Sequence, residues 1–226
     1  MTRLAKKLEW IYKLRGEDVQ SAMDELKGIE TNDPQTVLAY KERKLRELLD
    51  FVSRECELYR DIASRTTTAF ENGSAFEVLR DLPAVDKWTI KKNLAGFMSP
   101  GMKTSWRSTS GTTGTPFVFP KDKHASAYMD AMMYCAYEWH GIGPLTRQAR
   151  IWGSAVGIKG KTVQKAKDCL LGRKRLSAFE ISDTNCKKYF QQLLKHKPKY
   201  FYCYPNAMYQ FVLSLERQGL KGREIG

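Results

Sequence analysis

A run of hydroxyl side chains and glycines between Ser108 and Pro116 is the part of the sequence best suited to chemistry. Six hydroxyls and two glycines fall within these nine positions. Gly111 and Gly114 let the backbone approach an anion without a Cβ in the way, and successive N–H groups and rotatable hydroxyls can donate to its oxygens. The run is not a Walker loop, because neither glycine is followed by the lysine of that pattern. It predicts a loop that binds phosphate.

The stretch from Thr109 to Pro116 reads T-S-G-T-T-G-T-P and resembles the phosphate-binding loop of the adenylate-forming superfamily, the acyl-CoA synthetase type of ligase. Three further stretches, residues 59–60, 82–87 and 204–207, are similar to the phenylacetate-CoA ligase branch. Within that branch, the sequence looks nearest to the proteins named for capsular polysaccharide biosynthesis (CapK-like) and to coenzyme F390 synthetase.

The resemblance implies ATP-dependent activation of a small carboxylic acid. The carboxylate attacks the α-phosphate of ATP, pyrophosphate leaves, and a thiol such as coenzyme A then takes the acyl group. ATP with Mg²⁺ is the implied cofactor, and coenzyme A is a further one. The residues that the resemblance assigns to the β- and γ-phosphates are Thr109, Ser110, Gly111, Thr112, Thr113 and Gly114. It identifies no catalytic residue and no metal ligand in this sequence.

Two features depart from the family pattern. Phe117 follows the loop proline where many members have a lysine, and Lys121 and Lys123 are nearby lysines that could replace it. The later family motifs, which hold adenine, ribose and Mg²⁺ and supply a C-terminal lysine, do not occur in these 226 residues. We therefore expect the chain to correspond to the N-terminal part of a ligase and to show no turnover alone.

The charge balance leaves a second interpretation open. The sequence has 38 Lys and Arg against 25 Asp and Glu, and the resulting net charge of +13 attracts anions. Basic residues gather between positions 159 and 199, where aromatic side chains that could stack on bases also occur. The chain could thus be a basic, non-enzymatic module that binds nucleic acid or an anionic surface, or a decayed remnant. The loop favours a nucleotide over nucleic acid as the partner.

Composition is typical of a globular protein in a reducing compartment. Hydrophobic residues make up 42% of the 226 positions, which is enough for a core, and no run approaches the ~18 apolar residues of a membrane-spanning helix. Five cysteines without C-x-x-C spacing disfavour both zinc and a disulfide framework. We expect a cytoplasmic protein without a metal site. Nothing in the sequence indicates its oligomeric state.

The order of elements predicts an α/β fold in two parts. Residues 1–100 indicate a helical region that packs on the sheet, with Asp33 and Asp86 as helix caps. Residues 101–226 indicate the incomplete phosphate-loop portion of the AMP-binding domain. Strands expected at 149–152, 176–181 and 200–203 alternate there with helices over 124–140, 162–171 and 206–219 and one capped by Ser182. Such alternation is typical of parallel βαβ units.

Two stretches at expected strand ends are candidates for contact with substrate. Trp152, Gly153 and Ser154 follow one strand, and Tyr204 with Pro205 follows another. Open α/β sheets bind ligands beyond the carboxyl ends of their strands. By family likeness Tyr204 and Pro205 border the acyl pocket, although each stretch is also explained as a plain turn.

Overall fold

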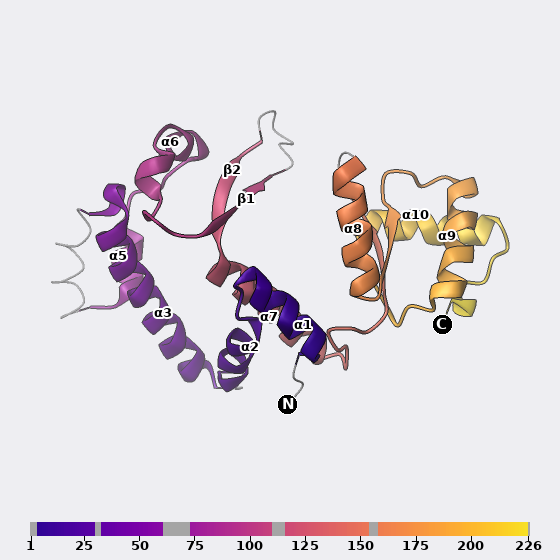
Figure 1. Ribbon diagram of the computed structural model, residues 1–226, viewed down its shortest axis with the longest axis horizontal. Helices are drawn as coiled ribbons and strands as arrows, with labels where there is room; N and C mark the ends of the chain where they lie inside the picture. Colours follow the sequence, from indigo (N-terminus) through magenta and orange to yellow (C-terminus); the bar gives the residue numbers. More distant parts are fainter. Residues whose placement is uncertain (1–3, 30–32, 61–72, 110–115, 154–157, 226) are drawn as a thin grey trace. The chain divides into compact units, whose positions relative to one another are not determined.

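The computed structural model describes residues 4–29, 33–60, 73–109, 116–153 and 158–225 (Figure 1). The backbone divides into two units, one formed by Lys6–Ala136 and the other by Met1–Ala5 together with Tyr137–Gly226. Helices, a hairpin and a parallel sheet occur together, which confirms the predicted α/β class. The predicted division of the chain near residue 100 stays a prediction.

The first unit is helical up to a β-hairpin. Its helical elements are α1 (Lys6–Arg15), α2 (Val19–Gly28), α3 (Pro34–Glu55), η1 (Glu57–Tyr59), α5 (Ala75–Asp81), α6 (Lys87–Lys92) and η2 (Leu94–Phe97). Strand β1 (Thr104–Ser108) then pairs antiparallel with β2 (Val118–Asp122), and α7 (Lys123–Glu138) follows. The sequence pattern also favours a loop for residues 104–107, but they form a strand with Ser108, because Thr and Trp suit a strand once a partner strand is present.

Local capping explains where three of these helices begin. Asp33 accepts hydrogen bonds from two N–H groups in the first turn of α3, and Pro34 occupies the first helical position. Ser74 and Glu77 form a reciprocal capping box at the start of α5. Asp86 accepts from an N–H group in the first turn of α6. Both predicted caps, Asp33 and Asp86, are confirmed.

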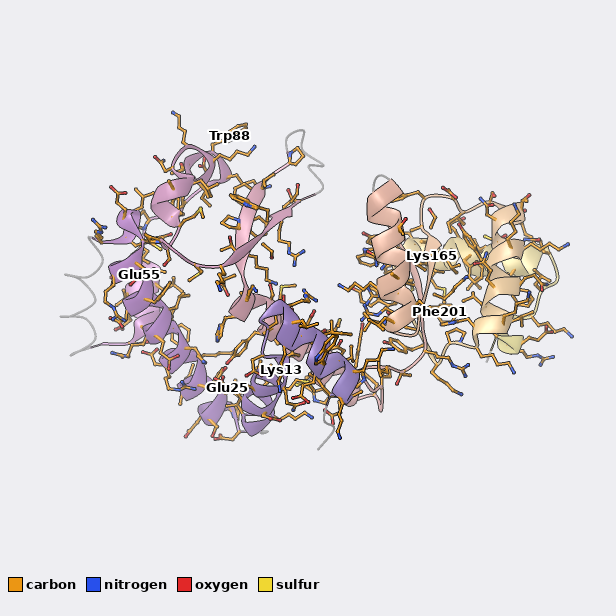
Figure 2. The ribbon with its side chains drawn as sticks, viewed as in Figure 1. Lys13, Glu25, Glu55, Trp88, Lys165 and Phe201 are labelled. Atoms are coloured by element: carbon orange, nitrogen blue, oxygen red, sulfur yellow. The ribbon has the colours of Figure 1, made fainter. Side chains whose placement is uncertain are left out.

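Glu25 of α2 lies where α2, α3 and α7 meet (Figure 2). Its carboxylate accepts a hydrogen bond from the Lys44 ammonium at 2.8 Å, from the Tyr40 hydroxyl at 3.1 Å and from the Tyr128 hydroxyl. The hydrogen bond from Lys44, followed by the one from Tyr128, lowers the pKa of Glu25 from its ordinary 4.5 to about 2. The Glu25 carboxylate thus links α2 to α3 and α7 by hydrogen bonds.

This arrangement predicts an acid dependence of stability. The pKa of Glu25 is lower in the folded chain, so its contribution is complete above pH 4.5 and is lost as the pH falls toward about 2. We expect Glu25→Gln to flatten the loss of stability over that interval in urea denaturation followed by circular dichroism. Glu57→Gln removes an exposed carboxylate and should leave the slope unchanged. Equal slopes for wild type and Glu25→Gln would contradict the assignment.

The second unit contains a three-stranded parallel sheet in the order β4-β3-β5. Its elements are β3 (Gln148–Trp152), α8 (Ile158–Leu170), β4 (Arg173–Ser177), α9 (Asp183–His196), β5 (Tyr200–Cys203), α10 (Pro205–Arg217) and η3 (Gly222–Glu224). Several predicted boundaries are wrong, including the helix expected over 162–171, which spans Ile158–Leu170. The strand expected at 176–181 lies at 173–177, and the last helix begins at Pro205 instead of Asn206, because proline suits the first helical position.

The two faces of this sheet differ in chemistry. Strands β3 and β4 pair so that Ile151 lies beside Leu176 and Arg150 lies beside Arg175. The first pair belongs to an apolar core with α9 and α10, whereas Arg175 contacts Asp168 of α8. Helix α8 and the α9–α10 pair therefore lie on opposite sides of the strands (Figure 1). Right-handed crossovers place the helices on opposite faces. The chain moves from β3 to β4 in one direction across the sheet, and from β4 to β5 in the opposite direction.

Within the described ranges, no helix is both long enough and apolar enough to cross a membrane. In the same part of the chain, no group of three or more His, Cys, Asp or Glu side chains is arranged to hold a metal ion. All five cysteines are free thiols.

Candidate functional site

The two ends of the phosphate-loop sequence are joined by a pair of hydrogen bonds. The Thr109 N–H donates to the Phe117 carbonyl at 3.0 Å, and the Phe117 N–H donates to the Thr109 hydroxyl oxygen at 3.0 Å. Strand β1 ends at Ser108 and β2 begins at Val118, so these contacts extend the ladder by one position. The Thr109 side chain closes the base of the loop while its hydroxyl proton stays available to a ligand.

The hairpin confirms that the hydroxyl- and glycine-rich run joins two strands. Among the predicted phosphate contacts, Thr109 falls within the described residues. The other predicted contacts lie outside them: Ser110, Gly111, Thr112, Thr113 and Gly114. Their assignment to the β- and γ-phosphates stays a prediction.

Neither of the lysines expected to replace the family lysine lies at the base of the loop. Lys121 is three residues along β2 from the last strand pair, roughly 10 Å away. The Lys123 side chain lies against Gly16, in the turn between α1 and α2. Phe117 stacks on Phe119 with ring centroids 5.6 Å apart. The position after the loop proline is thus an aromatic pair, and these two lysines do not place a cation there.

Strands β3 and β5 end side by side at an aromatic stack. The rings of Trp152 and Tyr204 are stacked, with centroids 3.8 Å apart and planes 14° apart, and Tyr202 packs on the same indole at 4.9 Å. The chain leaves β3 toward α8 on one face of the sheet and leaves β5 toward α10 on the other. Open α/β sheets bind ligands at such divergence points.

A cavity of about 530 Å³ opens beside this stack. It is lined by Ala178, Phe179, Ile181, Tyr204, Pro205, Asn206, Ala207 and Gln210. These side chains include two amides and no charged group. The Phe179 side chain is 80% exposed, so its ring is free to be covered by a ligand. Such walls suit an apolar body that carries one or two hydrogen-bonding groups.

The start of α10 adds hydrogen-bond donors to one wall of the cavity. Tyr204 occupies the N-cap position, and no side chain caps the helix there. Pro205 has no N–H, so the free N–H groups of the first turn begin at Asn206. The positive end of the helix dipole favours an oxygen with negative charge at this wall.

Arg175 fixes the backbone at the end of β3. Its guanidinium donates from Nε to Asp168 Oδ2 at 2.8 Å and from Nη2 to Asp168 Oδ1 at 3.2 Å, and its Nη1 donates to the Gly153 carbonyl at 3.3 Å. The ion pair is largely buried, with 16% and 7% of the two side chains exposed. The Phe179 ring also lies against Gly153. Together these contacts hold the residue that follows Trp152.

The structure brings the two candidate strand ends together: Trp152, Gly153, Tyr204 and Pro205. Ser154 lies outside the described residues. The sequence did not indicate the roles of Phe179, which was expected in a strand, and Arg175, which belongs to the basic residues between positions 159 and 199. Residues 173–177 begin with three consecutive basic side chains, so no alternation in the sequence places Arg175 on one face of a strand.

No protein-family model and no curated protein sequence matches this chain. Its fold is similar to part of a solved CoA ligase structure. The match is to the crystal structure of an open conformation of 2-hydroxyisobutyryl-CoA ligase in complex with 2-HIB-AMP and CoA, with a TM-score of 0.55 and 17% sequence identity. It covers 87% of this chain and 47% of the ligase, so the chain spans about half the length of that enzyme.

Proposed function

We propose that this chain supplies the ATP- and acid-binding part of a carboxylate-activating ligase. The observation that carries the proposal is the closed base of the hydroxyl- and glycine-rich loop, where Thr109 and Phe117 exchange two hydrogen bonds at the end of a hairpin. The fold likeness to a CoA ligase supports the same conclusion.

The loop residues are proposed to bind the β- and γ-phosphates of ATP. The hydrogen-bonded base at Thr109 and Phe117 supports this proposal, because catalysis of phosphoryl chemistry depends on positioning and electrostatic stabilisation. Residues 108–117 contain no carboxylate. Mg²⁺ therefore enters with the nucleotide in this proposal and neutralises charge on the phosphate oxygens.

The carboxylic acid is proposed to enter the cavity beside Trp152 and Tyr204. The apolar wall receives the body of the acid, and the free N–H groups at the start of α10 orient an oxygen. A thiol, coenzyme A in this proposal, takes the activated acyl group. A place in the phenylacetate-CoA ligase branch, close to the CapK-like proteins, is the corresponding family proposal and rests on the sequence resemblance.

The proposal is tested by nucleotide binding and not by turnover, because the match covers about half of the ligase. We expect Mg·ATP to bind the 226-residue chain in isothermal titration calorimetry, and Thr109→Val to weaken it about two- to tenfold, because one hydrogen bond at the loop base contributes roughly 0.5–1.5 kcal/mol. Ser105→Ala removes the hydroxyl that donates to the Lys121 carbonyl at the far end of the hairpin, and it should leave the affinity unchanged.

A second variant acts on the loop itself. Gly114→Val places a branched side chain where the backbone must approach phosphate, so it should reduce Mg·ATP binding strongly. Unchanged affinity in both Gly114→Val and Thr109→Val would remove the loop from the mechanism. Binding without Mg²⁺ that falls steeply with salt and is shared by RNA or DNA would instead support the basic, non-enzymatic module.

A further inference from the structure

The sheet face toward α8 carries an excess of positive charge that has no acidic partner among the described residues. The parallel register places Arg150 of β3 beside Arg175 of β4, and Gln148 beside Arg173. Asp168 is the acidic residue described on this face, and both of its carboxylate oxygens already accept hydrogen bonds from Arg175. Arg150 and Arg173 are therefore left as two cations without a carboxylate in hydrogen-bond contact.

Arg150 is held in place, and the positive charges near it outweigh the attraction of Asp168. Its Nε donates to the Gln148 side-chain oxygen, and its guanidinium lies 4.8 Å from the centre of the Tyr202 ring. Burial and then the charges of Arg173 and Arg175 lower the pKa of Arg150. The guanidinium is partly buried, and no protein acceptor is found for its two terminal nitrogens among the described residues, so they are open to an anion.

Two buried polar groups beside Arg150 lie near each other, and neither has a well-formed hydrogen bond. Within the described part of the chain, the Gln148 side-chain nitrogen and the Tyr137 hydroxyl are buried without a hydrogen bond of acceptable geometry, and Gln148 is 0% exposed. The charges of Arg150 and Arg173 reach the Tyr137 hydroxyl, where they oppose the larger effect of burial, which raises the pKa of Tyr137. Buried polar groups in proteins rarely stay unpaired, so these two donors indicate an acceptor that is not part of this face.

We propose that Arg150, Gln148 and Tyr137, with Arg173 at the edge, form a binding site for an oxyanion of the phosphate class. Each of these groups can donate a hydrogen bond, and two of them are cationic. A group with several acceptor oxygens and about two negative charges matches that set better than a single carboxylate. The proposal uses no residue of the hairpin loop and does not depend on the proposed ATP site.

The test measures phosphate binding to the 226-residue chain without Mg²⁺ and without a nucleotide. In isothermal titration calorimetry at constant ionic strength, we expect one equivalent of inorganic phosphate or pyrophosphate to bind. Arg150→Gln should weaken this binding roughly 10- to 100-fold, because it removes a charge-assisted hydrogen bond. The control is Lys165→Gln, which removes an exposed positive charge on α8 (Figure 2) and should change the affinity less than about twofold.

Further ligands identify the source of the phosphate group. Tighter binding of a phosphate monoester than of inorganic phosphate indicates an esterified ligand, and the reverse indicates a free one. Acetate that binds as tightly as phosphate would overturn the phosphate class, because an acidic side chain would then fit equally well. Equal losses in Arg150→Gln and Lys165→Gln would also overturn the proposal, since they would report general charge and not a site.

A second route covers the case in which Arg150→Gln does not fold, as judged by circular dichroism. Arg173 lies at the start of β4, and Arg173→Gln should also weaken phosphate binding. Independently, a ligand that binds the folded state alone raises its melting temperature, so phosphate should raise the Tm of the wild-type chain more than chloride at equal ionic strength. An unchanged Tm together with no calorimetric binding at millimolar phosphate would refute the site.

Discussion

Replacing Phe211 with alanine is expected to destabilise the sheet unit by roughly 3–5 kcal/mol. Phe211 of α10 is 1% exposed and packs in the core formed by the sheet, α9 and α10, next to Ile151 and Leu176. The substitution removes the aromatic ring from contact with its neighbours and leaves a cavity that a parallel sheet with its two helices can fill only in part. Urea denaturation followed by circular dichroism measures the free energy of unfolding.

The matched control is the same chemical change at a surface position. Phe179 is 80% exposed, so Phe179→Ala should change the free energy of unfolding by no more than about 0.5 kcal/mol. The two variants lose the same atoms, and the large difference between them is the burial of the ring. A loss below about 1 kcal/mol for Phe211→Ala would show that α10 does not pack on the sheet in solution, and the cavity at its start would then lose its wall.

Features that depend on near neighbours in sequence were predictable. Asp33 with Pro34, Asp86 and Ser182 start helices because their side chains accept from N–H groups two or three residues ahead. Gly141 and Gly172 follow helices with φ of +68° and +61°, which other residues adopt at a steric cost. Local rules of this kind also located the loop between two strands.

Features that depend on tertiary pairing were not predictable. The sequence does not indicate a strand at residues 173–177, because three of its five side chains are basic and propensity alone disfavours them. The strand forms because Leu176 enters the core while Arg175 meets Asp168 across the sheet face. The cavity could not be predicted from the sequence for the same reason, because its walls come from the segments after two strands and from the start of α10.

Replacing Asp168 with alanine is the second large effect, with an expected loss of roughly 3–5 kcal/mol. Asp168 accepts two hydrogen bonds from Arg175 and one from the Gln164 side chain at 3.1 Å. Only 7% of its side chain and 16% of that of Arg175 are exposed. Without Asp168, the buried Arg175 keeps the Gly153 carbonyl as a neutral partner and still faces the like charge of Arg150.

An exposed ion pair supplies the control. Asp50 and Arg54 form an i,i+4 pair on α3 with more than half of each side chain exposed, so Asp50→Ala should cost less than about 1 kcal/mol. The double variant Asp168→Leu/Arg175→Met separates the value of the buried pair from the penalty of an unpaired charge. It should be more stable than Asp168→Ala, because replacing both partners removes the uncompensated charge that makes the single substitution costly. If the double variant were as unstable as Asp168→Ala, lost packing between α8 and β4 would explain the loss, and the unpaired charge would not.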